Sequence, residues 1–246
     1  MRNYNEEFKD AEDQKYAYEF DEHLRRYMLR TFAPLWASDA SRALELGCYQ
    51  GDFTRHLTAH FDSVTVIDAS DELIAVASAR VDPSVTFIHS TFEEADIRDR
   101  FDAIFLVHTL EHLDSRIDTL SKVGGWLKPG GRLFVACPNA NAASRQIAVK
   151  MGLINSPDSV TPAEHAHGHR VTYNIDTLTR DIEAAGLTLH DQGGVFFKPL
   201  ANFQFDLLIG GEAISDGYLE GCYQLGFSYP DLCASIYAVC GRPGQP

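Results

Sequence analysis

The amino-acid sequence predicts an α/β fold with a doubly wound, mostly parallel sheet of seven strands. Short apolar runs alternate with amphipathic helical segments from residue 42 onward, a pattern typical of parallel strands that helices cover on both faces. The first run ends in a glycine turn followed by a helical segment, and the last two runs indicate closing strands antiparallel to each other. The expected strands are 42–46, 63–67, 85–88, 102–107, 132–136, 188–197 and 235–239.

Length and composition fit one large domain. The chain has 246 residues and 45% apolar content, which is enough for a packed core. Its net charge of −14 disfavours nucleic acid as a partner and favours a small or neutral substrate. Five cysteines without a CxxC pair suit reduced thiols. The polar N-terminus and the lack of a membrane-length apolar run predict a soluble, cytoplasmic protein with no membrane contact.

Residues 1–40 are predicted to form an N-terminal helical flap ahead of the main domain, 41–246. Apolar side chains recur in the flap at helical spacing. The helix either packs on the edge of the sheet or closes over a ligand with Tyr16, Tyr18 and Phe20. The sequence leaves both interpretations open.

Helices are expected between the strands, from about Asp52, Asp71 and Ser115. Ser115 or the residue before it can cap the third of these helices, and Lys128–Gly131 has the composition of the turn that ends it. A further helix follows Asn174, whose side chain can cap it.

Residues 198–230, between the last two strands, are rich in Phe, Tyr, Leu and Gly. A loop this long and apolar is uncommon, so an inserted cap of short helices is expected there. Its aromatic side chains would serve either as a lid that stacks on a ring substrate or as the surface of a homodimer. The sequence does not separate these two roles.

Ligands of open parallel sheets bind beyond the carboxyl ends of the strands. The positions that follow the first four strands are the glycine turn 47–51, Asp68, the pair Thr91 and Phe92, and the segment 108–112. The carboxylate of Asp68 can accept hydrogen bonds from ribose hydroxyls, and its spacing from the turn suits an acid in a nucleoside site. Turn and acid together predict a site that binds a nucleoside.

The segment 45–51, Glu-Leu-Gly-Cys-Tyr-Gln-Gly, resembles the E-x-G-x-G-x-G turn of class I S-adenosylmethionine-dependent methyltransferases. The resemblance extends roughly over residues 40–195 and is closest to the branch of ubiquinone-pathway O-methyltransferases and of sugar and natural-product methyltransferases. It implies a Rossmann-like methyltransferase fold and S-adenosylmethionine as the cofactor. The runs similar to later motifs of that family are 101–104, 108–113, 126–134 and 138–139.

The resemblance assigns the cofactor contacts to residues that follow the first strands, with two departures from the family pattern. Tyr49 stands where the family has its middle glycine, so an ordinary backbone conformation is expected at that residue. Thr91 replaces an acid, so backbone groups and Phe92 are expected to hold the adenine. The implied cofactor-binding residues are Glu45, Gly47, Cys48, Tyr49, Gly51, Asp68, Ala69, Thr91, Phe92 and His108.

Two groups of histidines compete for the role of catalytic base. His112 falls at the family's Glu-His position, where capping of the following helix is the alternative role. His165, His167 and His169 occupy alternate positions, so they would face one way in an extended chain. That group serves acceptor recognition or base chemistry, structural hydrogen bonding, or metal binding together with Glu164. The catalytic candidates are His112, His167 and His169, and no metal is assigned.

The sequence thus predicts an enzyme that transfers a methyl group from S-adenosylmethionine to oxygen or nitrogen of a small molecule, such as a sugar, nucleotide-sugar or secondary metabolite. Two other classes remain open, a non-catalytic cofactor-binding subunit for regulation or assembly and a protein or peptide methyltransferase. A dinucleotide-binding dehydrogenase would need a G-x-G-x-x-G spacing that Gly47 and Gly51 do not provide.

Overall fold

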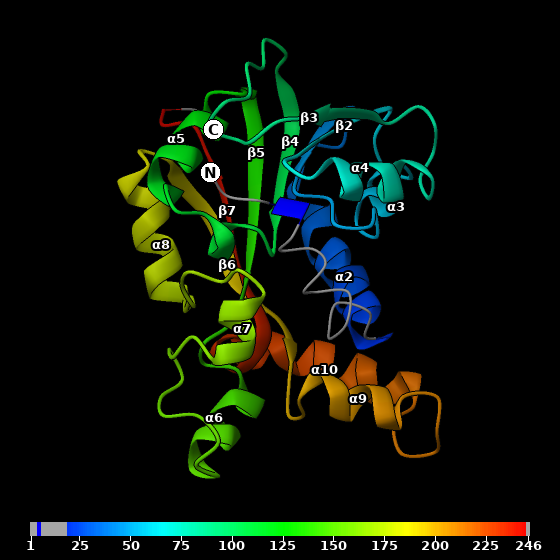
Figure 1. The fold of residues 1–246 in the computed structure, drawn as a ribbon, viewed down its shortest axis with the longest axis vertical. Coiled ribbons are helices and arrows are strands. Elements are labelled where there is room, and N and C mark those ends of the chain that lie inside the picture. Colours follow the sequence, from blue (N-terminus) through cyan, green and yellow to red (C-terminus); the bar gives the residue numbers. More distant parts are fainter. Residues whose placement is uncertain (1–3, 6–18, 245–246) are drawn as a thin grey trace.

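One sheet organises the computed structural model, which describes residues 4–5 and 19–244 (Figure 1). Its strands are β1 (Arg42–Leu46), β2 (Ser63–Asp68), β3 (Thr86–His89), β4 (Phe101–Val107), β5 (Leu127–Pro138), β6 (Thr188–Phe197) and β7 (Cys233–Gly241). The order is β3-β2-β1-β4-β5-β7-β6. Strands β1 to β5 run parallel, and β7 pairs antiparallel with both β5 and β6. The predicted fold class is therefore confirmed.

Helices cover both faces of this sheet. The helices that follow residue 18 are α2 (Glu19–Phe32), α3 (Thr54–Leu57), α4 (Asp71–Ser78), α5 (Arg116–Gly124), α6 (Ala143–Lys150), α7 (Pro162–Ala166), α8 (Ile175–Ala184), α9 (Asn202–Leu208) and α10 (Asp216–Ser228), and α6, α7, α9 and α10 lie beyond one end of the sheet (Figure 1). In Figure 1, α5 and α8 lie on one side of the strands and α2, α3 and α4 lie on the other. The buried side chains form two cores accordingly, one with Met28 of α2 and Leu57 of α3, the other with Leu120 of α5 and Ile182 of α8.

Side chains of the strands alternate between the two cores, as the two-residue period of a strand requires. In β4, Phe105 packs in the core shared with α2, whereas Ile104 and Leu106 pack in the core shared with α5. Phe105 also stacks on Phe134 of β5, with ring centroids 5.0 Å apart. Because both faces are covered, the strands are apolar on both sides, and this explains their continuous apolar runs.

Strand β5 begins earlier than expected. The segment Lys128–Gly131, which the sequence predicts to be a turn, lies within this strand. The pairing register shifts there, between Phe101 and Ala103 of β4, so the extra residues form an irregularity of the bulge type. Gly130 permits it, because its backbone is left-handed with φ of 76°. The turn prediction was wrong because the chain bulges without leaving the sheet.

The N-terminal helix α2 packs into the core. Phe20 is fully buried and stacks on Phe205 of α9, with ring centroids 4.3 Å apart. The carboxylate of Asp206 accepts hydrogen bonds from backbone N–H groups in the first turn of α2, and these groups have no partner within their own helix. Phe20 thus faces the core. The two tyrosines of the expected flap, Tyr16 and Tyr18, lie outside the described residues.

The region between β6 and β7 contains α9 and α10. Helix α10 packs against β6, and α9 packs against α2. Several apolar side chains of this region are more than half exposed, namely Phe203, Leu207, Phe227 and Tyr229. Whether this surface acts as a lid or as a dimer contact stays a prediction.

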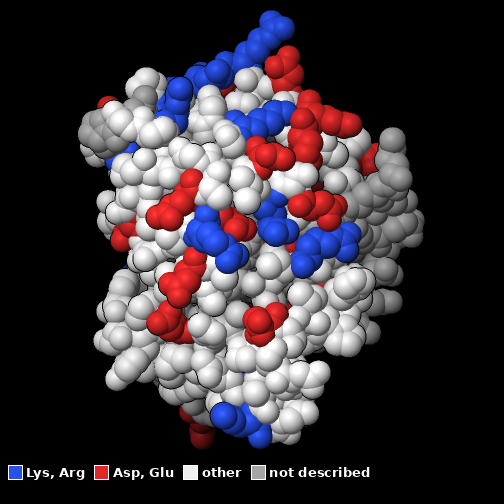
Figure 2. Space-filling view, turned by 90° about the vertical axis from the view of Figure 1, so that its left-hand side faces the viewer, with Lys and Arg blue, Asp and Glu red and all other residues white. Residues whose placement is uncertain are grey.

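Figure 2 shows the side of the molecule that carries α5, α6 and α8. Basic side chains alternate there with acidic ones and form no continuous basic surface on this side. The lower end of the view, over α6, is mostly uncharged. Three apolar side chains of α6 and of the residues that follow it are exposed, namely Ile147, Met151 and Leu153. All five cysteines are free and buried. Within the described part of the chain, no helix has the length and apolar character needed to cross a membrane.

The cap of α8 provides a test of the fold. The Asn174 side chain accepts a hydrogen bond from the Thr177 N–H at 2.8 Å, whereas Ser115 holds the equivalent position of α5 without such a bond. Asn174→Ala should lower the free energy of unfolding by about 1 kcal/mol, and Ser115→Ala by only a few tenths of that. Urea unfolding followed by circular dichroism measures both. Equal losses would contradict the capping role of Asn174.

Candidate active site

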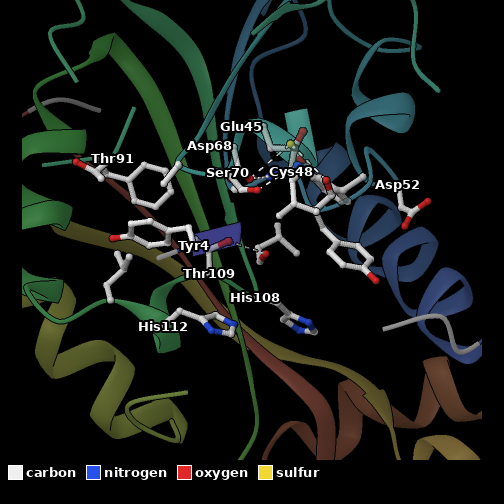
Figure 3. A pocket seen from close by; sticks show the side chains of 18 of the residues that line it. Tyr4, Glu45, Cys48, Asp52, Asp68, Ser70, Thr91, His108, Thr109 and His112 are labelled. Atoms are coloured by element: carbon white, nitrogen blue, oxygen red, sulfur yellow. Dashed lines mark hydrogen bonds between the residues drawn. The ribbon is translucent and has the colours of Figure 1, made fainter. Parts of the chain in front are cut away.

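A cavity lies at the carboxyl ends of the central parallel strands (Figure 3). It contains all of the predicted cofactor-binding residues except Gly51, whose added Cβ would instead meet Val81 Cγ1 at 2.8 Å. Lining the cavity puts these residues within reach of a ligand, and their individual contacts with the cofactor stay a prediction. The predicted residues that line it are Glu45, Gly47, Cys48, Tyr49, Asp68, Ala69, Thr91, Phe92 and His108.

The glycine turn after β1 has a left-handed backbone at three positions. The φ angles are 81° at Gly47, 47° at Tyr49 and 83° at Gly51. The expectation of an ordinary conformation at Tyr49 is therefore wrong, because the turn imposes a positive φ on a tyrosine where the family has glycine. At Gly47 the space is also closed, since an added Cβ would lie 2.7 Å from Thr109 Oγ1. The backbone of the turn is thus exposed to the cavity without an intervening side chain at Gly47.

The carboxylate of Asp68 connects the turn after β1 with the residues that begin α4. Its Oδ2 accepts a hydrogen bond from Cys48 N–H, and its Oδ1 accepts one from Ser70 N–H, both at 2.9 Å. Burial raises the pKa of Asp68, and these backbone bonds oppose that rise. Glu45 lies nearby with only 2% of its surface exposed, and burial raises its pKa to about 8. Two buried acids, Asp68 and Glu45, therefore lie next to the turn, and backbone N–H groups hold Asp68 in place.

Two residues near the N-terminus also reach this part of the molecule, and the sequence analysis predicted neither. Tyr4 lines the cavity (Figure 3). Asn5 donates a hydrogen bond to Asp71 Oδ1 at 2.8 Å and accepts one from Ser70 Oγ at 2.7 Å. No sequence motif marks these contacts, because the partners are 65 and 66 positions apart in the chain.

Arg25 of α2 is another residue of the cavity that the sequence analysis did not predict. Among the described residues that line the cavity, it supplies the single Lys or Arg side chain. Its Nη1 lies 3.9 Å from Asp52 Oδ2, at the edge of ion-pair distance. The helical spacing did contain a signal, since Arg25 directly follows the buried Leu24 and so lies beside the inward face of the helix.

The histidines come together from two distant segments. His112 and His169 lie with ring centroids 4.6 Å apart and an interplanar angle of 82°. His112 and His167 line the cavity, whereas His165 is exposed. The condition under which the alternate histidines would face one way is not met, because α7 includes His165 and the chain then turns through a left-handed Gly168 with φ of 82°.

Glu111 ties the histidine segment to the end of β4. Its carbonyl accepts a hydrogen bond from Arg170 N–H at 2.8 Å, and its side chain is 1% exposed. A carboxylate oxygen of Glu111 and ring nitrogens of His112 and His169 lie within 4.8 Å of one another. Burial raises the pKa of Glu111 to about 8 and lowers that of His169 to about 4. The His169 imidazole is therefore neutral at pH 7. Glu164, which would join the histidines in the metal-binding alternative, forms an ion pair with Arg145 at 2.5 Å.

The comparison with known families decides the class of the chain. A family model described as a methyltransferase domain matches residues 20–192, which is more than half of the sequence. The chain belongs to this methyltransferase family. The predictions of an S-adenosylmethionine-dependent methyltransferase, and of that compound as its cofactor, are confirmed.

Curated relatives of this methyltransferase carry the name ubiquinone biosynthesis O-methyltransferase. The protein of that name from Rhodopseudomonas palustris is 30% identical over 164 residues, which is 65% of this chain and 64% of the relative. The one from Aeromonas salmonicida is 28% identical over 183 residues, 70% of this chain and 75% of the relative. The first alignment thus spans slightly less than two thirds of that relative.

Solved structures share the fold at lower identity. The N-methyltransferase NodS from Bradyrhizobium japonicum, in complex with S-adenosylhomocysteine, matches with a TM-score of 0.60 and 17% identity, over 97% of this chain and 99% of NodS. A putative methyltransferase of Haloferax volcanii, in complex with the activator Trm112, matches with a TM-score of 0.61 and 15% identity, over 98% of this chain and 95% of its own.

The turn of this methyltransferase can be tested at Gly47. Gly47→Ala combines a positive φ with a collision against Thr109 Oγ1, so the dissociation constant for S-adenosylhomocysteine should rise at least about tenfold, the equivalent of 1.4 kcal/mol. Isothermal titration calorimetry measures it, with circular dichroism to verify folding. Gly130→Ala is the matched control, because Gly130 also has a positive φ but an added Cβ there meets nothing within 4 Å. Unchanged binding in Gly47→Ala would contradict the dependence of cofactor binding on the conformation of this turn.

Proposed function

We propose that this protein transfers a methyl group from S-adenosylmethionine to a hydroxyl oxygen of a small molecule. The observation that carries the proposal is the adjacency, in one cavity, of the buried Asp68 turn and His112, which is paired with His169. A sugar, a nucleotide-sugar or a secondary metabolite would offer such a hydroxyl. Oxygen is favoured over nitrogen because the relatives at 28–30% identity are named O-methyltransferases, whereas the match to the N-methyltransferase NodS is a likeness of fold at 17% identity.

The described residues fit the cofactor. The Asp68 carboxylate, with backbone donors fixing its position, suits the ribose hydroxyls. The side chains of Phe92 and Tyr4 offer apolar surface for the adenine ring. The guanidinium of Arg25 suits the carboxylate of the methionine end. When bound, S-adenosylmethionine supplies a methyl group on a sulfonium sulfur, which already makes a good leaving group.

His112 then acts as the base. The acceptor hydroxyl would give its proton to a ring nitrogen of His112 as its oxygen bonds to the methyl carbon, while the bond between that carbon and the sulfur breaks and its electron pair stays on the sulfur. The edge-to-face packing on His169 fixes the orientation of the His112 ring. His169 is neutral at pH 7 because burial lowers its pKa to about 4, so it places no positive charge against the proton that His112 receives. Holding the acceptor beside the cofactor supplies the remainder of the rate through proximity.

The proposal as a whole is tested with methyl-labelled S-adenosylmethionine. The protein is incubated with a cellular small-molecule extract, and labelled products are identified by mass spectrometry. A labelled methyl ether is the expected product. Saturable cofactor binding without any labelled product would favour a non-catalytic subunit, and a labelled protein or peptide would redirect the search for the acceptor.

The assignment of Arg25 to the carboxylate end of the cofactor can be tested separately. Arg25→Ala should weaken S-adenosylhomocysteine binding roughly 10- to 100-fold, because a charge-assisted hydrogen bond is lost. Binding of 5′-methylthioadenosine, which lacks the amino-acid end, should not change. Calorimetry with both ligands distinguishes a lost contact from general damage. Arg26→Ala, at the exposed neighbouring position of α2, is the control. An equal loss for both ligands would reject this role.

The role of His112 as base predicts a separation of turnover from binding. His112→Ala should lower turnover of the identified acceptor about 10²- to 10⁴-fold, the usual contribution of a general base. Affinity for S-adenosylhomocysteine should stay within about twofold, which is only 0.4 kcal/mol. The exposed His165, changed to Ala, is the control and should keep full turnover. Turnover that survives in His112→Ala would assign the proton to another group.

A further inference from the structure

Charged side chains from several segments lie close enough to His108 and His169 to act on them electrostatically, and one of these side chains, that of Arg25, lines the cavity. Asp21 and Arg25 belong to α2, Arg145 to α6 and Glu164 to α7, while Lys198 directly follows β6. The charges of Asp21, Arg145 and Glu164 all act on the Lys198 ammonium, so these groups share one neighbourhood. The molecule as a whole is strongly acidic, so the local group of three cations, Arg25, Arg145 and Lys198, departs from the charge of the rest and would attract an anionic ligand.

The backbone holds Lys198 in a fixed position. Its N–H donates a hydrogen bond to the Leu232 carbonyl at 3.4 Å, and its own carbonyl accepts one from Ser144 N–H at 2.9 Å. Its ammonium lies 5.8 Å from the ring centroid of Phe20, which is fully buried. The side chain is half-buried. Lys198 is thus anchored at the junction of β6 with α6, and its ammonium lies near Phe20 in the first turn of α2.

The other charges of the group have partners. Arg145 and Glu164 form an ion pair at 2.5 Å, Asp21 accepts a hydrogen bond from Asn202 Nδ2 at 2.9 Å, and Arg25 lies 3.9 Å from Asp52. The Lys198 ammonium, by contrast, forms neither a hydrogen bond nor an ion pair within the ranges 4–5 and 19–244. Burying an ammonium whose three N–H donors have no acceptor costs free energy, unless a bound ligand accepts these hydrogen bonds.

Lys198 also lies on the side of the cavity where methyl transfer is proposed. His108 lines the cavity together with Arg25. Its Nε2 lies 2.8 Å from Ser235 Oγ, and Ser235 pairs with Val195 of β6. Strand β6 therefore leads from the neighbourhood of His108 to Lys198. Burial, with smaller contributions from nearby positive charges that include Lys198, lowers the pKa of His108 to about 3. The two residues therefore sense each other electrostatically.

We propose that Lys198 binds an oxyanion, a carboxylate or a phosphate, of the methyl acceptor, so that the enzyme selects acidic hydroxyl compounds. This inference rests on the proposed function, because it takes the space beside His108 and His112 as the acceptor site. The anion would accept the donors that Lys198 otherwise leaves unused, and it would offset the charge that burial makes costly. Its distance from the histidines would set which hydroxyl of the acceptor faces His112.

The experiment compares three phenols of similar shape, each titrated into the full chain saturated with S-adenosylhomocysteine. The probes are 4-hydroxybenzoate, 4-hydroxyphenylphosphonate and the neutral 4-hydroxybenzamide. Binding is measured by calorimetry, or by ligand-observed NMR where affinity is weak. The wild-type protein should bind at least one anion about 10- to 100-fold more tightly than the amide, which is the usual range for a charge-assisted hydrogen bond. The better of the two anions distinguishes carboxylate from phosphate recognition.

Lys198→Met should remove this preference and leave S-adenosylhomocysteine affinity unchanged, which also shows that the variant is folded. Lys150→Met, at the exposed end of α6, removes the same charge elsewhere and should keep the preference. The inference is overturned if the wild type does not prefer either anion, or if the preference persists in Lys198→Met. Failure of the wild type to bind S-adenosylhomocysteine would instead overturn the proposed function.

Discussion

The buried carboxylate of Asp68 is the interaction on which the cofactor side of the molecule depends. It accepts one backbone hydrogen bond from Cys48, in the turn after β1, and one from Ser70, which caps α4. The Ser70 hydroxyl accepts a bond from Leu73 N–H and donates one to Asn5. One carboxylate therefore fixes the spacing of two strand ends and the start of a helix, and through Ser70 it is connected to Asn5. Charged acceptors form stronger hydrogen bonds than neutral ones, and this suits a carboxylate that positions several segments of the chain at once.

This half of the site could be predicted from the sequence because its information is local. Strand β1, the glycine turn and Asp68 follow one another in a short stretch, and each has a recognisable residue type. The backbone of Tyr49 could not be predicted, since a bulky residue rarely adopts a positive φ. The turn maintains it through a hydrogen bond from Gly51 N–H to the Cys48 carbonyl at 2.8 Å. The strain is of order 1–2 kcal/mol, small enough for one closed turn to offset.

The histidine segment shows how a local pattern can mislead. Alternate spacing places side chains on one side only in a strand, and α7 is a helix. The sequence did contain the signal for that helix: the Glu164 carboxylate accepts from Thr161 N–H at 2.8 Å, while Thr161 Oγ1 accepts from Glu164 N–H at 3.2 Å. This is the Thr-x-x-Glu capping box, with Pro162 at the first helical position. The approach of His169 to His112, in contrast, depends on tertiary packing that no local pattern reports.

The acceptor side is assembled from distant segments, yet its backbone is tied to the segments that follow β4 and β6. Arg170 N–H bonds to the Glu111 carbonyl at 2.8 Å, and Ser144 N–H bonds to the Lys198 carbonyl at 2.9 Å. Both ties involve only main-chain atoms, so they survive replacement of the side chains at these positions by any residue except proline, which lacks the N–H donor. Acceptor choice can therefore change through single side chains, such as that of Lys198, while the sheet edge and the cofactor turn keep their geometry. This separation explains why motifs of the cofactor side identify the family and leave the acceptor to residues that carry no motif.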